Sequence, residues 1–242
     1  MIIGGDGYVG SALNLAVPDD TVLYLAFMSN NDMCERNPVL ARRLNEGAFE
    51  SCLKENRGKR FIFASSVAAY GDCLNATEDM PLTPTTLYGR AKAKCEQMLK
   101  DYGCDYTIVR SASVCGVSPR MRYDLMVNRM VRDAARTGKI TVNGGEQKRS
   151  HVHINDLCRF YAWLIENPQP KQIFNVVCEN QSVMETAKLV ASVVGKTEIV
   201  VKPYTDSRSY TVSGKKMLEA GFECRSTIEE AIVSVYLNTL YE

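Results

Sequence analysis

The sequence predicts an α/β fold built on a doubly wound parallel sheet. Apolar runs of strand length alternate with segments of helical length along the chain, without repeats or low-complexity linkers. This alternation is typical of parallel sheets. The chain also opens on a short apolar run, a glycine cluster and a helix start, Met1-Ile-Ile-Gly4-Gly5-Asp6-Gly7-Tyr8-Val9-Gly10-Ser11. A glycine turn between a first strand and a helix fits the same fold class.

Local signals place the elements of the first half. The expected elements are, in order, a strand at 1–3, a short helix from 11, a strand at 21–28, a helix at 38–56, a strand at 60–65, a loop at 72–86 and a helix from 88 to about 102. The leading strand is short, because the glycines begin at Gly4. The loop is rich in proline, threonine and aspartate, which favour turns.

The second half continues the alternation. Its expected elements are a strand at 106–109, a helix at 124–137, short strands near 140 and 150, a helix carrying Trp163, a strand at 173–177, a helix at 183–194, a strand at 198–202 and a helix at 228–240. Gly138 is placed to end the helix before it. Asn155 or Asp156 is placed to cap the helix that carries Trp163.

The composition is that of an ordinary globular enzyme. With 242 residues, of which 45% are hydrophobic and 24% charged, the chain can bury the core of one domain or slightly more. The net charge of +1 carries no nucleic-acid or membrane-surface signature. The apolar runs are far shorter than the roughly 18 residues of a membrane span. We therefore expect no nucleic-acid partner, no membrane partner, no signal peptide and a cytoplasmic location.

The cysteines and histidines give no sign of a metal site. Nine cysteines are scattered along the chain without C-x-x-C spacing. An odd, dispersed set indicates reduced thiols in a cytosol and not a disulfide framework or a zinc site. The only histidines, His151 and His153, alternate on an expected strand. We expect no metal.

The glycine turn fits two related nucleotide-binding patterns. Glycines at 5, 7 and 10 match the dinucleotide fingerprint, and those at 4, 7 and 10 match its G-x-x-G-x-x-G relative. Such a turn lacks Cβ atoms so that backbone N–H groups and a helix N-terminus can approach a pyrophosphate. The alternative is a tight turn that binds nothing. Asp6 places a carboxylate in this loop, so it must point away or be neutralised.

Tyr88 and Lys92 form the most informative pair. Of the twelve tyrosines, only Tyr88 has a lysine four positions later, and on a helix this spacing places both side chains on one face. An ammonium beside a phenol favours the phenolate, which predicts that Tyr88 exchanges protons near neutral pH instead of near 10. Ser65 and Ser66 end the apolar run before this helix. Alone, the pair would indicate only a surface tyrosine beside a solvated lysine.

Together these motifs resemble the extended short-chain dehydrogenase/reductase family, in its NAD-dependent nucleotide-sugar epimerase/dehydratase branch. The resemblance runs from Gly4 to about Leu240. The segments that carry it after the glycine turn are the fourth-strand sequence Tyr24–Ala26, Asn45 in the next helix, the serine motif Ser65–Gly71, the tyrosine motif Pro84–Lys92, the nicotinamide strand and loop Val109–Gly116, the segment Lys148–Asp156, and Asp206–Arg208 with Lys216.

The resemblance implies NAD as the cofactor, with NADP as the open alternative, and a nucleotide sugar as the substrate. It implies cofactor contacts by Gly4, Gly7, Tyr8, Val9, Gly10, Leu25, Ala26, Ala64, Ser65, Tyr88, Lys92, Ser111 and Ala112. The implied catalytic residues are Ser66, Tyr88 and Lys92, and the implied substrate contacts are Ser66, Ser113, Arg149 and Arg208. The two arginines suit a diphosphate, although each also fits a solvated surface arginine. A homodimer through the helices near 38–56 and 88–102 is also implied.

The chain departs from the family near its beginning. The segment at 21–26 reads as the fourth strand, so strands two and three and their helices are missing. The acidic residue that holds the adenosine ribose is missing with them. An alternative alignment makes 21–29 the second strand and Asp32 that acid. We expect a truncated Rossmann-like cofactor domain at 1–113, with 140–180 interleaved, and a small substrate lobe within 114–242.

The residues that follow Ser66 within the serine motif limit the reaction type. Family members that eliminate water need a carboxylate just after the serine, where this chain has Val67 and Ala68. The sequence therefore predicts epimerisation or keto-sugar reduction, which need only the serine, tyrosine and lysine. Ser113 and Ser150 stand where the family has asparagine and aspartate, which leaves the substrate open. A degenerate member that binds a nucleotide or nucleotide sugar without turnover is the alternative.

Overall fold

The computed structural model describes residues 1–203 and 209–241. In the first half the elements are β1 (Ile2–Ile3), the 3-10 turn η1 (Gly10–Ala12), β2 (Thr21–Tyr24), α1 (Asn31–Arg36), α2 (Pro38–Arg42), the π-helical segment η2 (Arg43–Gly47), α3 (Ala48–Glu55), β3 (Arg60–Ser66), the 3-10 turn η3 (Val67–Ala69), β4 (Cys73–Ala76), α4 (Leu87–Tyr102) and β5 (Tyr106–Ser111). In the second half they are β6 (Ser113–Cys115), α5 (Met126–Thr137), β7 (Lys139–Asn143), β8 (Lys148–His153), α6 (Ile154–Glu166), β9 (Gln172–Val176), β10 (Glu179–Ser182), α7 (Val183–Val194), β11 (Glu198–Lys202), β12 (Tyr210–Val212), α8 (Lys215–Glu219) and α9 (Ile228–Tyr241).

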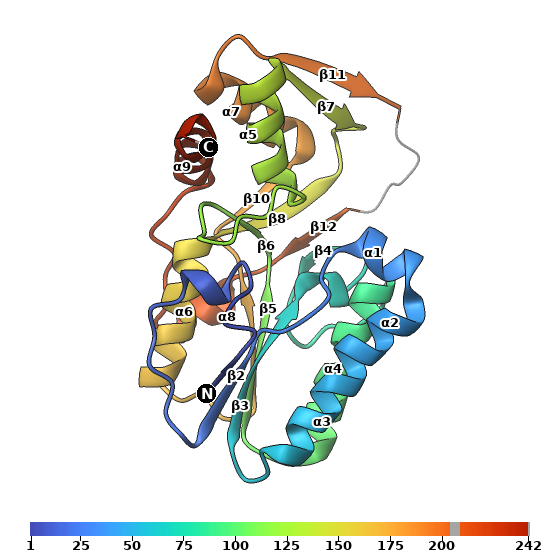
Figure 1. Cartoon of the computed structure of the whole chain (residues 1–242), viewed down its shortest axis with the longest axis vertical. Helices are drawn as coiled ribbons and strands as arrows, with labels where there is room; N and C mark the ends of the chain where they lie inside the picture. Colours follow the sequence, from blue (N-terminus) through green and yellow to red (C-terminus); the bar gives the residue numbers. More distant parts are fainter. Residues whose placement is uncertain (204–208, 242) are drawn as a thin grey trace.

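A parallel five-stranded sheet with the order β1-β2-β3-β5-β9 forms the main body. Helices α3 and α4 lie against one face, and α6 covers the other (Figure 1). Alternate side chains of each strand reach opposite cores: Val22 and Tyr24 pack with Phe49 of α3, whereas Leu23 packs with Leu157 of α6. The predicted doubly wound sheet is confirmed.

The strand order confirms that the second and third strands are absent from the described sheet. β1 pairs directly with β2, with Ile3 opposite Tyr24, and β2 pairs in turn with β3. If β2 were the family's second strand, it would pair with the edge of β1 that faces away from β3. Instead β2 lies between β1 and β3, which is the place of the family's fourth strand. The alternative alignment is therefore wrong. Asp32 lies exposed in the first turn of α1.

The helix expected after the glycine turn is wrong. Only the single 3-10 turn η1 forms, and the chain then runs without regular structure to β2. Leu13, Leu15 and Val17 pack on the core, while the residues between them are exposed. This period of two suits an extended chain and not a helix, whose apolar face repeats every three to four residues. The glycine turn therefore lacks the long helix that normally follows it.

Three smaller differences concern boundaries and caps. The helix expected at 38–56 is divided into α2, η2 and α3, and the chain forms α1 and β4 where loops were expected. The cap of α6 is His153, whose Nδ1 accepts a hydrogen bond from the Asn155 N–H at 3.0 Å, and not Asn155 or Asp156. Asp156 caps a different segment, as described below.

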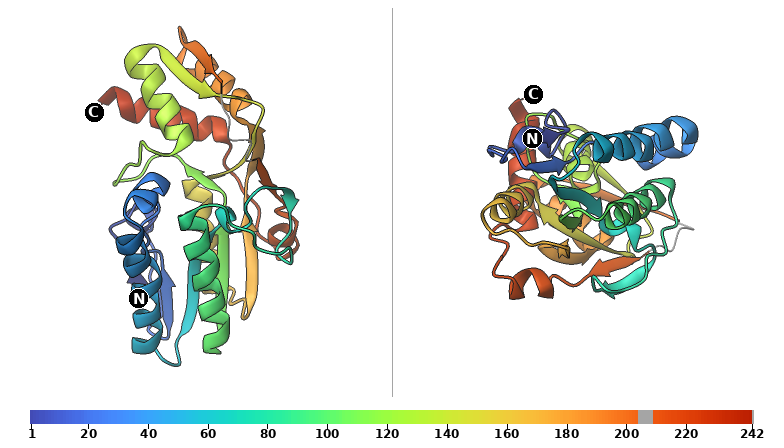
Figure 2. Two further views of the ribbon diagram at one scale, coloured as in Figure 1. Left: turned by 90° about the vertical axis from the view of Figure 1, so that its right-hand side faces the viewer. Right: turned by 90° about the horizontal axis from the view of Figure 1, so that it is seen from below.

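A smaller lobe lies over the carboxyl ends of the sheet strands (Figure 2). It holds the three-stranded sheet β10-β8-β6 and the pair β11-β7. Helices α5, α7 and α9 share one apolar core that includes Val131, Val190 and Ile232. The division into domains at the expected boundaries stays a prediction. Among the described residues, no helix has the length and apolar character needed to cross a lipid bilayer.

Candidate active site

A cleft of about 1280 Å³ opens between the sheet and the lobe. The carboxyl ends of β1, β2, β3 and β5 face it, which is where open parallel sheets bind ligands. The cleft brings together every residue expected to contact the cofactor, which are Gly4, Gly7, Tyr8, Val9, Gly10, Leu25, Ala26, Ala64, Ser65, Tyr88, Lys92, Ser111 and Ala112. Ser66 and Ser113 line it as well.

Close backbone contacts explain the glycines at 4 and 10. Gly4 has a φ of +90°, and a Cβ there would lie 2.5 Å from the backbone nitrogen of Ala26. A Cβ at Gly10 would lie 2.2 Å from the Gly4 carbonyl oxygen. The turn is therefore folded back on itself and packed against the end of β2, which favours the pattern at 4, 7 and 10. Asp6 is exposed and does not line the cleft.

Gly89 allows the helix that carries Tyr88 to pack closely on the serine motif. Thr86 caps α4 by accepting a hydrogen bond from the Gly89 N–H at 3.0 Å. A Cβ at Gly89 would lie 2.5 Å from the carbonyl oxygen of Ala68, so the first turn of α4 packs directly on η3. The Ser66 hydroxyl accepts a hydrogen bond from the Ala68 N–H at 3.2 Å, which fixes it at the same junction.

Lys92 is buried instead of facing the Tyr88 hydroxyl. Its Nζ donates to the Ala64 carbonyl oxygen at 2.5 Å and lies 3.5 Å from the centre of the Phe27 ring. The centre of the Tyr88 ring is farther away, at 5.7 Å. Only 3% of Lys92 is exposed, and burial lowers its pKa to about 7.

The expected depression of the Tyr88 pKa is wrong for this arrangement. Burial raises the pKa of the Tyr88 hydroxyl, and this effect outweighs the opposite effects of the Ser66 hydroxyl and the Arg122 charge. Removing water penalises the phenolate. The lysine directs its ammonium to a carbonyl and an aromatic ring instead. Tyr88 therefore does not exchange protons near neutral pH through Lys92 alone.

A buried ion pair that the sequence analysis missed fixes α4 to the sheet. Glu96, one turn beyond Lys92, accepts hydrogen bonds from Arg110 of β5 at 3.0 and 2.7 Å and from the Ser65 hydroxyl at 2.5 Å. The guanidinium also donates to the Tyr70 hydroxyl at 2.7 Å. An arginine inside an apolar strand was the available signal, because a buried charge needs a partner.

Arg149, one of the two arginines assigned to a diphosphate, is not in the cleft wall. Arg149 donates to the Lys148 carbonyl oxygen and lies over the Tyr210 ring, 4.7 Å from its centre. Tyr210 lines the cleft, but Arg149 does not. Arg208 lies outside the described residues. The cationic side chains that do line the cleft in the described part of the chain are Lys92, Arg120 and Arg122, and the sequence analysis missed both arginines.

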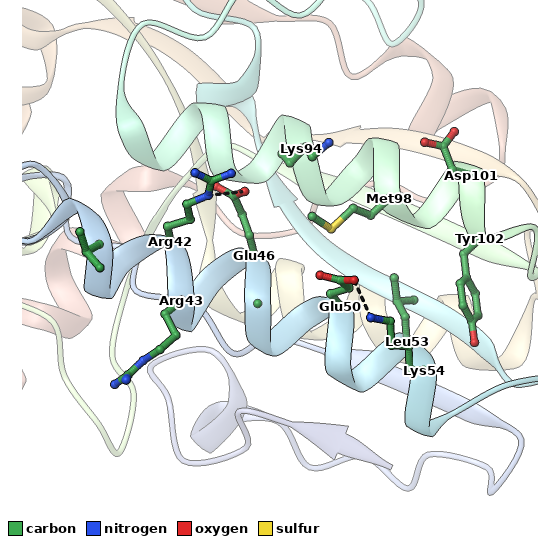
Figure 3. Close-up of a pocket in the computed structure, with 12 residues that line it drawn as sticks. Arg42, Arg43, Glu46, Glu50, Leu53, Lys54, Lys94, Met98, Asp101 and Tyr102 are labelled. Atoms are coloured by element: carbon green, nitrogen blue, oxygen red, sulfur yellow. Dashed lines mark hydrogen bonds and ion pairs between the residues drawn. The ribbon is translucent and has the colours of Figure 1, made fainter.

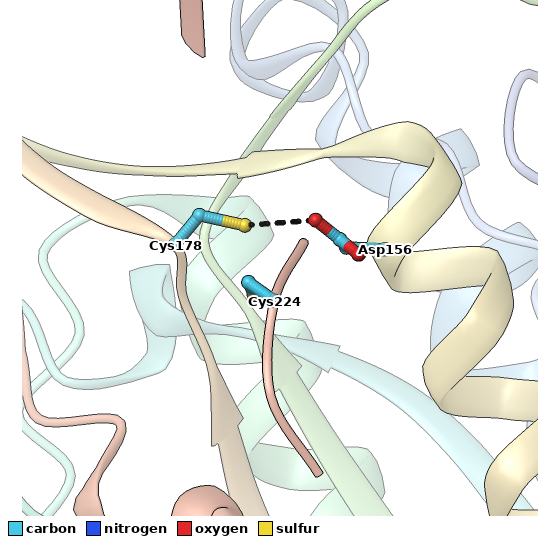
Figure 4. A group of neighbouring side chains, drawn as sticks. All are labelled: Asp156, Cys178 and Cys224. Carbon is cyan, nitrogen blue, oxygen red and sulfur yellow. Dashed lines mark hydrogen bonds between the residues drawn. The ribbon is translucent and has the colours of Figure 1, made fainter. Parts of the chain in front are cut away.

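Asp156, Cys178 and Cys224 form a cluster (Figure 4), and none of them lines the cleft. Asp156 accepts hydrogen bonds from the N–H groups of Arg225 and Ser226 at 3.1 and 2.8 Å and also pairs with Arg159. A hydrogen bond with Cys224, together with burial, raises the pKa of the Cys178 thiol. The carboxylate is thus already used to hold the segment before α9. All nine cysteines are free thiols.

His151 is fully buried on β8. Neither ring nitrogen has a hydrogen-bond partner in the described part of the chain. Burial lowers the pKa of His151 to about 4, so the ring is neutral at physiological pH. His151 does not line the cleft.

Comparisons with known proteins identify the family of the chain. Residues 20–177 match the family described as the NAD dependent epimerase/dehydratase family. D-erythronate dehydrogenase of Haemophilus influenzae is 33% identical over 106 residues, 40% of this chain and 33% of that protein. A trifunctional UDP-glucose 4,6-dehydratase/UDP-4-keto-6-deoxy-D-glucose 3,5-epimerase/UDP-4-keto-L-rhamnose-reductase of Arabidopsis thaliana is 21% identical over 234 residues, 88% of this chain and 35% of that protein. The chain spans about a third of the length of these curated relatives.

Solved structures show the same fold. UDP-glucose 4-epimerase of Thermotoga maritima with UDP-glucose is 26% identical, with a TM-score of 0.81 over 92% of this chain and 78% of that one. UDP-glucose 4-epimerase of Thermus thermophilus in complex with NAD is 21% identical, with a TM-score of 0.84 over 99% and 98%. With the family match covering well over half of the sequence, the chain belongs to the NAD dependent epimerase/dehydratase family.

Proposed function

We propose that the chain is an NAD(P)-dependent nucleotide-sugar epimerase or keto-sugar reductase that uses Ser66, Tyr88 and Lys92. The observation that carries this proposal is the convergence of these three residues on one cleft with the glycine turn. The packing of Gly89 on Ala68 supports it, because it sets the distance between the tyrosine helix and the serine. The structures of relatives with NAD and with UDP-glucose bound support the same ligand classes.

The residues have separate roles in this proposal. Tyr88 removes the proton from a sugar hydroxyl, and Ser66 donates a hydrogen bond to the reacting oxygen. The nicotinamide, when bound, accepts hydride from the same carbon or returns it. Lys92 holds the nicotinamide ribose. Since Nζ lies beneath the Phe27 ring, a ribose hydroxyl reaches it only when that ring turns aside.

Epimerisation or reduction fits the cleft better than dehydration. The residues after Ser66 are Val67, which is buried, and Ala68. Neither side chain has an ionisable group, so neither can supply a proton. Among the described residues that line the cleft, the acidic ones are Glu55 and Asp124. Asp124 pairs with Arg122, and Glu55 ends the helix that precedes β3, whereas the serines lie at the far end of that strand. Elimination of water needs an additional acid beside the reacting carbons, and no described side chain is placed for it.

Binding without turnover is the second candidate. The single turn η1 and the two-residue strand β1 favour it, because they leave little structure for the adenosine end of a dinucleotide. A cofactor that binds too weakly would leave the catalytic residues idle. The serine, tyrosine and lysine of the tyrosine side are nevertheless all present in the cleft, so the enzyme is preferred.

A homodimer through the outer helices is part of the proposal. A groove of about 860 Å³ runs between η2 and α3 on one side and α4 on the other (Figure 3). Ion pairs Arg42–Glu46 and Glu50–Lys54 lie along it at 3.5 and 2.6 Å. Light scattering of the purified protein tests this, and a monomer at all concentrations would count against it.

The decisive test of function is product formation. Purified protein is denatured, and the supernatant is examined by absorbance and mass for a nicotinamide dinucleotide. The protein is then incubated with NAD and UDP-glucose, or with reduced cofactor and a 4-keto sugar nucleotide. We expect a C4 epimer in the first case or an alcohol in the second. Accumulation of a 4-keto-6-deoxy product, with loss of one water, would contradict the assignment, and binding without any product would favour the second candidate.

A further inference from the structure

Residues 116–124 of the lobe cross the mouth of the cleft. The Arg122 guanidinium donates to the Ser29 hydroxyl, in the loop after β2, and pairs with Asp124 through Nε at 3.0 Å and through Nη2. Asp124 in turn accepts a hydrogen bond from the Asn30 side chain at 3.0 Å. The lobe and the loop at 27–30 are therefore joined through one arginine and one aspartate.

Both ends of this connection are firmly placed. The buried Asn45 side chain bonds the N–H and the carbonyl oxygen of Met28 at 2.7 and 3.1 Å, which fixes the loop that carries Ser29. On the lobe side, the Tyr8 hydroxyl donates to the Gly116 carbonyl oxygen at 2.7 Å, and the Ser118 hydroxyl donates to the Tyr8 carbonyl oxygen at 2.6 Å. Arg122 is thus held between the glycine turn and the end of β2.

The glycine turn, which contacts this segment through Tyr8, is where a dinucleotide places its diphosphate. Ligands of open parallel sheets lie outside the carboxyl ends of the strands, with the diphosphate at the glycine turn. In most such turns the following helix supplies partial positive charge and free N–H groups. Here the helix is replaced by the three residues of η1, so most of that contribution is missing. A diphosphate needs another source of positive charge.

Of the three cationic residues of the described cleft wall, Arg122 has a guanidinium fixed by hydrogen bonds to Ser29 and Asp124, whereas Arg120 is exposed. Lys92 is almost fully buried beneath Phe27. Arg122 also lies close enough to Tyr8 and Tyr88 for its charge to lower the pKa of both hydroxyls against the larger effect of burial. It therefore lies between the glycine turn and the proposed catalytic tyrosine. Two of its five N–H donors are not used by Ser29 or Asp124, and a guanidinium presents paired donors to phosphate oxygens.

We propose that Arg122 binds the diphosphate of the dinucleotide and replaces the positive end of the missing helix. Asp124 and Ser29 act as positioning residues, because they fix the plane of the guanidinium. This inference rests on the proposed function for the identity of the ligand. A sugar nucleotide carries the same diphosphate group, so the test has one arm for each source.

Arg122→Gln is compared with Arg57→Gln, an equal change of charge in the exposed turn after α3. Titrations with NADH, followed by its fluorescence, and calorimetry with UDP-glucose give the affinities at low and physiological salt. We expect Arg122→Gln to weaken NADH binding by roughly ten- to a hundredfold, with a weaker salt dependence, because a charge-assisted contact is lost. Arg122→Lys should restore part of the affinity, and Arg57→Gln should bind like the wild type. Circular dichroism confirms that each variant is folded.

The outcomes separate the inference from the proposed function. Wild-type protein that binds NADH, with unchanged affinity in Arg122→Gln, overturns the inference and leaves the proposed function standing. Equal losses in Arg122→Gln and Arg57→Gln also overturn it, since they would reflect net charge alone. Loss of UDP-glucose binding only would overturn the assignment to the dinucleotide. Wild-type protein that binds neither ligand would overturn both proposals.

Discussion

The two sides of the cleft are held by different kinds of contact. The tyrosine side, formed by β3, η3, α4 and β5, is anchored by the buried Glu96–Arg110 pair and by α4 packed on η3. The glycine side, formed by β1, residues 4–12 and the loop at 25–30, rests on a two-residue strand and one 3-10 turn. Its links to the lobe combine the buried hydrogen bonds of Tyr8 with Gly116 and Ser118 and the partly exposed pair of Arg122 and Asp124. The proposed catalytic groups are thus held by buried contacts, whereas we expect the affinity for the cofactor to depend on a reduced set of contacts.

The largest effect is expected from the chemistry of the tyrosine side. Tyr88→Phe removes the proton carrier but little volume, so turnover should fall by roughly a thousandfold or more while NADH affinity stays within a few-fold. Steady-state kinetics and NADH titration on the same preparation check this. Lys92→Ala should reduce both turnover and NADH affinity. This difference distinguishes the proposed role of Tyr88 in proton transfer from that of Lys92 in cofactor binding. Turnover at the wild-type level in Tyr88→Phe would remove the proposed mechanism.

The next effect concerns stability and contrasts two ion pairs. Glu96→Ala leaves the Arg110 charge buried without its partner, and such losses cost about 3–5 kcal/mol in the free energy of unfolding. Asp124→Ala breaks the Arg122 pair at the cleft mouth, where both side chains are partly exposed, and should cost less than about 1 kcal/mol. Urea unfolding of both variants measures the difference. An equal decrease in the free energy of unfolding in both variants would show that the tyrosine side and the glycine side are anchored equally.

Local sequence signals predicted the elements best where the start and end of an element are set by neighbouring residues. The helix α5 ends at Gly138, which has a φ of +67°, as expected. Ser182 caps α7, and Glu185 completes the capping box. The serine motif reached the cleft because β3 ends there, and the tyrosine motif reached it because the first turn of α4 packs on η3. These features depend on contacts close in sequence or on the sheet order alone.

The failures have long-range causes. The helix expected after the glycine turn was lost because Leu13, Leu15 and Val17 find a core partner in an extended chain. Arg122 was missed because its partner Ser29 is 93 positions away, and no local pattern marks such a contact. The assignment of Arg149 to a diphosphate stays a prediction, because the side chain lies over Tyr210 and not in the cleft wall. The pKa of Tyr88 was misjudged because spacing on a helix does not reveal burial.

A pH-dependent effect follows from the buried lysine. The pKa of Lys92 is about 7 in the folded protein and near 10.4 in the unfolded chain. Below pH 7 both states carry the charge, so the folded state bears the full cost of burying it. Between about pH 7 and 10 the unfolded state binds more protons, and stability rises with pH. Lys92→Met should therefore be more stable than the wild type at pH 6, and this advantage should shrink toward pH 9 to 10.

Urea unfolding of both proteins from pH 6 to 10 provides the measurement. Lys54→Met, in which an exposed lysine of α3 is replaced, is the control and should show no such trend relative to the wild type. A constant difference between the wild type and Lys92→Met across this range would mean that Phe27 and the Ala64 carbonyl stabilise the ammonium fully, so that its pKa is not lowered.

The smallest effect tests the glycine side directly. The acid expected on the adenosine ribose is absent with the missing strands, and Asp6 and Asp32 do not line the cleft. Losing charge-assisted hydrogen bonds worth roughly 1.5–3 kcal/mol weakens binding by about ten- to a hundredfold. The same loss removes the repulsion that normally rejects the 2′-phosphate of NADP. We therefore expect weak binding, in the high micromolar range, with affinities for NAD and NADP that agree within a few-fold by calorimetry. Tight binding that strongly prefers NAD would require a carboxylate near the adenosine ribose, either Glu55 from the far end of the cleft or one from a partner subunit, and the glycine side would then be as complete as the tyrosine side.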